Sequence, residues 1–175
     1  YMTEWPAGIC DFPVARHQNR KEVRRGTRAG QVSIYCGREA IIDSGLDWEA
    51  VDKSRVGFFV GTTEHGHVET ENEVAVINAY GYDVKYWSHH HNPRSIPNNQ
   101  AGELCLNAGL TGPHRRIGAA SAAGHYGLIY GAHQPMPGDV DVAVAGGATD
   151  ALRTLGILAC FLALHARAHI AADHA

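Results

Sequence analysis

The stretch that decides the fold is Pro113-His-Arg-Arg-Ile-Gly-Ala-Ala-Ser-Ala-Ala-Gly-His-Tyr-Gly-Leu128, which is followed by Asp139-Val-Asp-Val-Ala-Val-Ala-Gly-Gly-Ala-Thr149. The pattern predicts a strand over 117–120, a sharp turn of small residues and a buried helix over 121–132, with the next strand over 140–145. Ser121 stands on the turn. The free N–H groups and the dipole of the following helix favour a developing anion there. The sequence therefore places a nucleophilic side chain between a strand and a helix N-terminus.

Strands and helices alternate along the rest of the chain. Residues 56–60 have the composition of a buried strand. Helices are predicted over 21–44, 70–80 and 97–107, although Gly26 and Gly30 weaken the first half of the first helix. Thr70 and Glu73 have the spacing of a capping box, and the polar, aromatic stretch 81–95 is loop-like. The alternation predicts an α/β fold, with helices covering a mixed sheet.

Composition limits the classes of function. A chain of 175 residues with 45% hydrophobic content fits one globular domain, and its net charge of −3 argues against nucleic-acid binding. The start of the chain has no signal-peptide pattern, and the longest apolar run, 155–164, is too short to span a bilayer. The cysteines at 10, 36, 105 and 160 form no C-x-x-C pair and are predicted to be reduced, mostly buried thiols. These features predict a soluble, cytoplasmic protein.

Four motifs occur in one order along the chain: Arg55-Val-Gly-Phe-Phe-Val-Gly-Thr62, Ile96-Pro-Asn-Asn-Gln-Ala-Gly102, Ala119-Ala-Ser-Ala-Ala-Gly124 after Gly112-Pro113, and Asp141-Val-Ala-Val-Ala-Gly-Gly147. In order and spacing they resemble the β-ketoacyl-acyl-carrier-protein synthases, the condensing enzymes of fatty-acid and polyketide synthesis. The resemblance covers nearly all of the chain from about Arg20 to Arg167. It implies a thiolase-like fold in which Ser121 occupies the nucleophile position.

The resemblance also implies what lies beyond these motifs. Residues 1–175 correspond to a partial N-terminal half of a pseudo-duplicated synthase, and the C-terminal half, with two catalytic histidines and a lysine, is not present in this chain. No cofactor or metal is implied, because substrates arrive on the phosphopantetheine arm of an acyl carrier protein. The family works as a dimer, so a homodimer or a heterodimer with a related subunit is expected. Residues 114–120 would be the strand that pairs across the twofold axis.

The main departure from the family is Ser121, where these synthases carry cysteine. A thiolate is accessible near neutral pH, whereas a serine hydroxyl needs a general base, and its oxygen ester is a poorer acyl donor. Ser121 is therefore a slower acyl-accepting nucleophile, a relic in a subunit that no longer condenses, an engineered replacement that traps acyl groups, or a helix N-cap without chemistry. A bulky side chain at Gly124 is expected to disrupt the packing of the turn against the helix.

A second departure is Leu155-Gly-Ile-Leu-Ala-Cys-Phe161, where the family places small glycines along its acyl tunnel. Leu158 and Ala159 would fill that space, unless the run is simply part of the core. Two hypotheses follow. The chain belongs to an acyltransferase that uses Ser121, or it belongs to a catalytically silent, chain-length-factor-like partner of an active synthase.

The histidines and the basic cluster carry weaker signals. His125 lies one turn after Ser121 and is predicted to serve packing or hydrogen bonding. His89-His90-His91 lack a partner ligand at a recognised spacing, so a structural loop is favoured over a metal site. His165 and His169 lack the glutamate of a H-E-x-x-H motif. The cluster 20–25 is a solvated helix face or a docking site for an acidic carrier protein.

Overall fold

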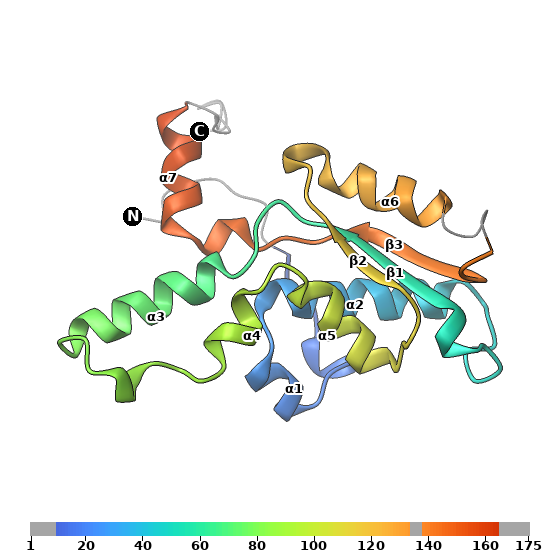
Figure 1. The fold of residues 1–175 in the computed structure, drawn as a ribbon, viewed down its shortest axis with the longest axis horizontal. Helices are drawn as coiled ribbons and strands as arrows, with labels where there is room; N and C mark the ends of the chain where they lie inside the picture. The colour runs from blue at the N-terminus through green and yellow to red at the C-terminus, as the bar shows by residue number, and fades with distance from the viewer. Residues whose placement is uncertain (1–9, 134–137, 165–175) are drawn as a thin grey trace, which may run out of the picture.

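A parallel sheet forms the centre of the computed structural model, which describes residues 10–133 and 138–164 (Figure 1). Its strands lie in the order β2-β1-β3, with bounds β1 (Val56–Gly61), β2 (His114–Ile117) and β3 (Val142–Gly147). In the register, Gly61 lies opposite both Ile117 of β2 and Gly147 of β3. The predicted α/β class is confirmed. Within the described part of the chain the sheet is parallel throughout, where a mixed sheet was expected.

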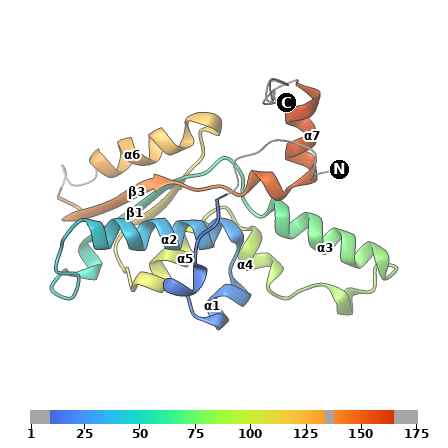
Figure 2. The ribbon, with the colours of Figure 1, turned by 180° about the vertical axis from the view of Figure 1, so that it is seen from behind.

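Helices cover both faces of this sheet. Helices α2 (Arg28–Asp43) and α5 (Asn99–Ala108) pack side by side below it, while α6 (Ala123–His133) lies on the opposite face against β1 and β3 (Figures 1 and 2). The other helices are α1 (Arg20–Arg25), α3 (His67–Ala79), α4 (His91–Ser95) and α7 (Leu155–Ala163). The strands are therefore held between two helical layers, and their carboxyl ends emerge at one edge.

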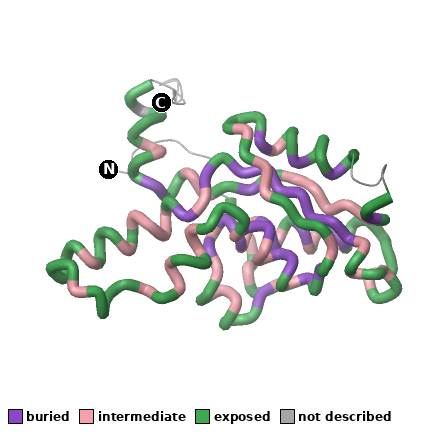
Figure 3. Tube along the Cα trace, viewed as in Figure 1, coloured by how far each residue is buried: buried purple, intermediate pink, exposed green. Residues whose placement is uncertain are grey.

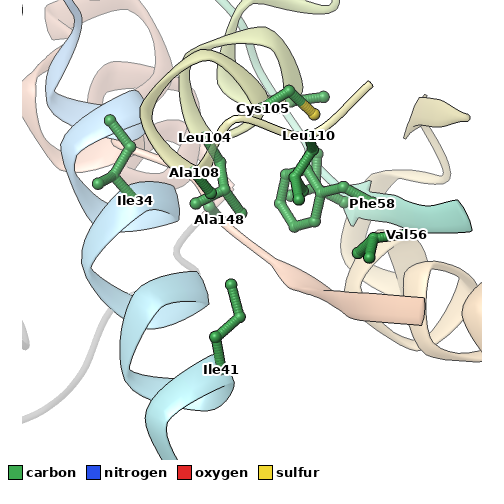
Figure 4. Packing of buried hydrophobic residues seen from close by; sticks show 11 residues of the cluster. Ile34, Ile41, Val56, Phe58, Leu104, Cys105, Ala108, Leu110 and Ala148 are labelled. Carbon is green, nitrogen blue, oxygen red and sulfur yellow. The ribbon is translucent and has the colours of Figure 1, made fainter. Parts of the chain in front are cut away.

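The main core lies between the sheet and the layer formed by α2 and α5. Every residue of β1 is buried, and Phe58 meets Ile34 and Leu104 in one cluster (Figures 3 and 4). Because successive strand residues point to opposite faces, Phe59 lies on the side of α6. This alternation ties both helical layers to the same central strand.

Small residues bring α6 unusually close to the sheet. A Cβ added to Gly127 would overlap the carbonyl oxygen of Gly146, and one added to Gly131 would overlap the side chain of Ala145. A Cβ on Gly61, at the end of β1, would overlap the carbonyl of Ala123. Backbone therefore packs on backbone, which fixes the start of α6 relative to the end of β1.

The helix predicted over 21–44 is two helices. Asn19 and Glu22 form a capping box at the start of α1, and the side chain of Thr27 accepts the N–H of Gly30 at 2.9 Å to begin α2. Gly26 ends α1 in an extended conformation, so the chain turns before α2. The glycines that weakened the prediction mark this break.

The capping box predicted at Thr70 and Glu73 is wrong. Helix α3 begins earlier, at His67, after Gly66 in the left-handed region (φ 64°). The carboxylate of Glu73 instead accepts the N–H of Ser88 at 3.0 Å. Within the predicted loop 81–95, the structure has a short 3-10 turn, Val84–Tyr86, and α4.

Two expectations about apolar residues also fail. Cys105 is buried, and burial raises the pKa of its thiol to about 11, but Cys10, Cys36 and Cys160 are exposed. Cys160 is exposed because α7 stands away from the sheet (Figure 1). Leu155 and Phe161 of α7 are exposed as well, so this apolar run is not part of the core of the described chain.

None of the described helices has the length and apolar character needed to cross a membrane.

Candidate active site

The candidate active site lies where the carboxyl ends of the three parallel strands meet, the edge at which open α/β sheets place their ligands. The segments that follow β1, β2 and β3 come together there: 62–66, 118–122 and 148–154. A hydrogen bond from Thr62 N–H to the carbonyl of Ile117, 3.0 Å long, joins the first two segments. A bond from Ala148 N–H to the carbonyl of Gly61, also 3.0 Å, joins the first and third.

The structure places Ser121 on the turn between β2 and α6, as predicted. The helix starts slightly later than expected, because a 3-10 turn, Ala120–Ala122, precedes it. Ala120 has φ 44°, a left-handed conformation that costs a residue with a Cβ free energy. The strained residue directly precedes Ser121, and it turns the chain sharply from strand to helix.

Replacing Ala120 by glycine is expected to keep or raise the stability of the fold while slowing acylation at Ser121. Glycine adopts φ 44° without strain, so the variant should be as stable as the parent or about 1 kcal/mol more stable. The freed turn should hold Ser121 less firmly, and acylation at Ser121 should slow several-fold. Urea unfolding and acylation rates check the two effects. A loss of stability would show that the left-handed conformation at Ala120 is not strained.

Ser121 itself is exposed, and its hydroxyl makes no hydrogen bond within residues 10–133 and 138–164. His125, one turn further along, is also exposed and has no hydrogen bond in the same ranges, so neither role predicted for it is found. No base from the described residues therefore reaches the Ser121 hydroxyl. A serine in this position needs a proton acceptor from elsewhere to act as a nucleophile.

Glu64 is a residue at this edge that the sequence analysis missed. Its side chain is only 5% exposed, and its carboxylate accepts the N–H of Asp150 at 2.9 Å and the hydroxyl of Thr149 at 3.2 Å. The ring of His67 lies 3.3 Å away. Glu64 thus ties the segment after β1 to the segment after β3. The available signal was an acidic residue three positions after a fully buried strand.

Two further carboxyl groups crowd Glu64. Burial raises the pKa of Asp150, with Glu64 adding to the rise and Arg153 opposing it. Burial also raises the pKa of Glu69, again with a contribution from Glu64. The edge beside the nucleophile turn is therefore acidic and partly desolvated.

The variant Asp150→Asn is expected to be more stable than the parent at neutral pH. A carboxyl whose pKa is raised on folding stabilises the fold when protonated, and that contribution is lost as pH rises from its unfolded pKa of about 3.9 through its folded value. The difference in melting temperature should be small near pH 4 and should grow towards pH 7, in favour of asparagine. Thermal unfolding at both pH values measures it. A difference that does not change with pH would contradict the assignment.

A cationic group on β2 also lies near this edge. The guanidinium of Arg116, on β2, is 3.4 Å from the ring of His65. Burial, and then the charge of Arg116, lower the pKa of His65. Both effects favour the neutral form of the His65 ring beside the end of β2.

The three consecutive histidines do not join this site. The rings of His89 and His90 lie with centroids 4.0 Å apart and their planes tilted by 45°, and His91 packs edge-on against Trp87. Residues 10–133 and 138–164 contain no group of three or more His, Cys, Asp or Glu side chains that could hold a metal ion. His165 and His169 lie outside the described residues.

The segment predicted to fill an acyl tunnel forms α7. Leu158 is half-buried and Ala159 is exposed. The carboxylate of Glu71, from α3, accepts the N–H groups of Leu155 and Gly156 at 2.8 and 3.0 Å. Glu71 thus caps the start of α7, where a negative charge is favourable, and orients the helix. Whether Leu158 and Ala159 close a tunnel stays a prediction.

Fold and site together define a class: an α/β domain with a hydroxyl on a strained turn between a parallel strand and a closely packed helix. Residues 13–169 match the family model described as "Beta-ketoacyl synthase, N-terminal domain". The chain therefore belongs to the β-ketoacyl synthase family, and the resemblance read from its motifs is confirmed.

Individual relatives agree with the family assignment. The chain is 30% identical over 168 residues to the tetracenomycin polyketide synthase ketoacyl synthase alpha subunit of Streptomyces glaucescens, covering 91% of this chain and 38% of that protein. It is 28% identical over 159 residues to a 3-oxoacyl-[acyl-carrier-protein] synthase 2 of Vibrio cholerae, covering 90% and 37%. The chain thus spans about two fifths of the length of these relatives.

Solved structures match the fold. A type II polyketide synthase acyl-carrier protein in complex with its ketosynthase matches with a TM-score of 0.78 and 22% identity, covering 87% of this chain and 43% of that one. The ishigamide ketosynthase/chain length factor matches with a TM-score of 0.78 and 21% identity, covering 94% and 40%. These matches confirm the predicted thiolase-like fold.

Proposed function

We propose that this chain is the N-terminal part of a β-ketoacyl synthase-type condensing protein of fatty-acid or polyketide biosynthesis, with Ser121 as the acyl acceptor. The observation that carries the proposal is the position of Ser121. It is exposed on a strained turn at the start of α6, within a chain that belongs to the condensing-enzyme family. The protein would then be an acyltransferase.

In the proposed reaction the Ser121 oxygen attacks the thioester carbonyl of an acyl chain carried on phosphopantetheine. The new C–O bond forms as the C–S bond breaks, the hydroxyl proton passes to a base, and the phosphopantetheine sulfur leaves as a thiolate that takes the proton back from that base. The N-terminus of α6 favours the negative charge that develops on the carbonyl oxygen. Because no described residue reaches the Ser121 hydroxyl, the base in this scheme comes from outside residues 10–133 and 138–164. No cofactor enters this scheme.

The absence of a base near Ser121 among the described residues favours a second candidate function. A catalytically silent, chain-length-factor-like subunit needs no nucleophile. A serine in place of the family's cysteine, whose hydroxyl has no hydrogen-bond partner among the described residues, fits that role. One relative by structure is itself described as a ketosynthase/chain length factor.

The exposed surface of α6 supports the proposal that these residues are one part of a larger domain. Tyr126, Leu128, Ile129 and Tyr130 are all exposed large apolar side chains on this one helix. A helix with apolar residues on its outer side is normally covered by a further layer. The second half of a duplicated synthase would supply that layer, together with the catalytic histidines.

The proposed partners are an acyl carrier protein and a second synthase subunit. Arg24 and Arg25 of α1 are exposed, and the guanidinium of Arg94 binds both of their carbonyl oxygens, which concentrates positive charge for an acidic carrier. Strand β2 pairs only with β1 among the described strands, so its other edge is open to pairing across a dimer axis. A cytoplasmic location stays a prediction.

Intact-protein mass spectrometry after incubation of the full-length protein with acyl-carrier protein or acyl-CoA tests the proposal. We expect a covalent acyl adduct that maps to Ser121 and is absent from Ser121→Ala. Absence of the adduct in the parent, together with stable association with a cysteine-bearing synthase, would replace the acyltransferase by the silent partner.

A further inference from the structure

Strand β2 lies on the outside of the sheet, and two of its four residues are arginines. It pairs with β1 alone among the described strands, so the backbone N–H and C=O groups along its other edge have no partner strand there (Figure 1). An open edge of this kind is a template for a strand from another chain. The sequence of β2, His114-Arg115-Arg116-Ile117, limits which strand that is.

The charges of both arginines are uncompensated. Neither arginine forms an ion pair within residues 10–133 and 138–164. Arg115 is exposed, and Asp139 shares a surface hollow with it without reaching ion-pair distance. The guanidinium of Arg116 is half-buried. Its Nη2 donates to the carbonyl oxygen of Thr62 at 3.5 Å and lies 3.4 Å from the ring of His65, and neither group is an anion.

A symmetric pair of β2 strands would set these charges against one another. If the open edges of two copies paired about a twofold axis, the strands would run antiparallel, and each residue would face a residue of the other copy. Centring the axis on Arg115, on Arg116 or midway between them places an arginine opposite an arginine. Like charges directly opposite each other destabilise a strand pair, whereas opposite charges stabilise it.

We propose that the open edge of β2 pairs with a strand of a different chain, which carries aspartate or glutamate opposite Arg115 and Arg116. The same two arginines disfavour pairing with a second copy of this chain. The second synthase subunit proposed above is then a distinct protein with an acidic facing strand. This inference rests on the proposed pairing of β2 across a dimer axis, and not on acylation of Ser121.

A charge-reversed copy of the full-length protein serves as the test partner, because Arg115→Glu/Arg116→Glu differs from the parent only at the two arginines. Analytical ultracentrifugation with one of the two proteins labelled measures both self-association and mixed association. We expect the mixed dimer to be about tenfold tighter than either self-dimer, since the facing pairs change from like to opposite charge. A parent self-dimer as tight as the mixed dimer would overturn the proposal. So would the absence of association in every mixture, which would mean that the arginines only protect the edge.

Salt supplies an independent sign. Raising the salt concentration from about 0.1 M to about 1 M shortens the screening length from about 10 Å to about 3 Å. It should therefore weaken the mixed dimer and strengthen self-association of the parent. A mixed dimer that does not respond to salt would contradict pairing through charge.

Two further variants assign the effect to β2. Arg115→Glu alone changes only the exposed position, and it should keep part of the preference even if Arg116→Glu disturbs the fold. The matched control, Arg20→Glu/Lys21→Glu, makes the same change of net charge on α1 and should show no preference for the parent. An equal preference in this control would exclude β2 as its source. None of these measurements involves acyl transfer, so a failed acylation test leaves them unaffected.

Discussion

Replacing Ser121 by cysteine is expected to raise the rate of acylation at this position by about a hundredfold or more. A positioned general base typically accelerates such a reaction by a factor of about 10²–10⁴. The Ser121 hydroxyl has no such base among the described residues, and a thiolate would not need one. A thiol with a pKa near 8.5 is already a few per cent thiolate at pH 7 and needs less help. The N-terminus of α6 lowers that pKa further. Acylation should therefore increase with pH up to the pKa of the thiol.

Stopped reactions with acyl-carrier protein, followed by peptide mapping, measure this gain. Mapping is required because Cys10, Cys36 and Cys160 are exposed and offer competing thiols. The matched control is Ser121→Ala, which should show no adduct on the turn peptide. A correctly folded Ser121→Cys protein that gains nothing would mean that the acyl chain does not reach the turn, and it would decide for the silent partner.

The sequence was sufficient for the parts of the fold that rest on local chemistry. The strand at 56–60 and the turn at Ser121 were predictable because an apolar strand and a turn of small residues can each be recognised from a short run of consecutive residues. The family resemblance supplied the rest of the architecture. Helix boundaries were harder. Glu73 has the spacing of a cap, but Gly66 in its left-handed conformation starts α3 one turn earlier.

The candidate site was only half predictable for a different reason. Ser121 is recognisable from its own neighbours in sequence, whereas Glu64 acquires its role from contacts with Thr149 and Asp150, 85 and 86 residues away. The burial of Glu103 against Thr27 and Gly30 is likewise a product of tertiary packing. No local pattern marks a carboxylate that becomes buried by a distant segment.

The variant Gly127→Ala is expected to destabilise the fold by about 3 kcal/mol or more, at the upper end of the cost of overpacking. The added methyl group would overlap the carbonyl oxygen of Gly146 and would lie 2.9 Å from the backbone nitrogen of Gly61. Both obstacles are backbone atoms of the central sheet, so no side chain can rotate away. Helix α6 would have to move outward, and the 3-10 turn that leads directly into α6 carries Ser121. Acylation should therefore fall together with stability.

The matched control lies on the same helix. A Cβ on Gly124 meets only the Cα of Gly147, at 4.0 Å, so Gly124→Ala fits and should gain the helix propensity of alanine over glycine, about 1 kcal/mol. This places the critical contact at Gly127, where the sequence had pointed to Gly124. Urea unfolding of the two full-length variants measures the contrast. Similar stabilities would mean that α6 is not held against the sheet by direct backbone contact, and that the position of Ser121 is set by other parts of the protein.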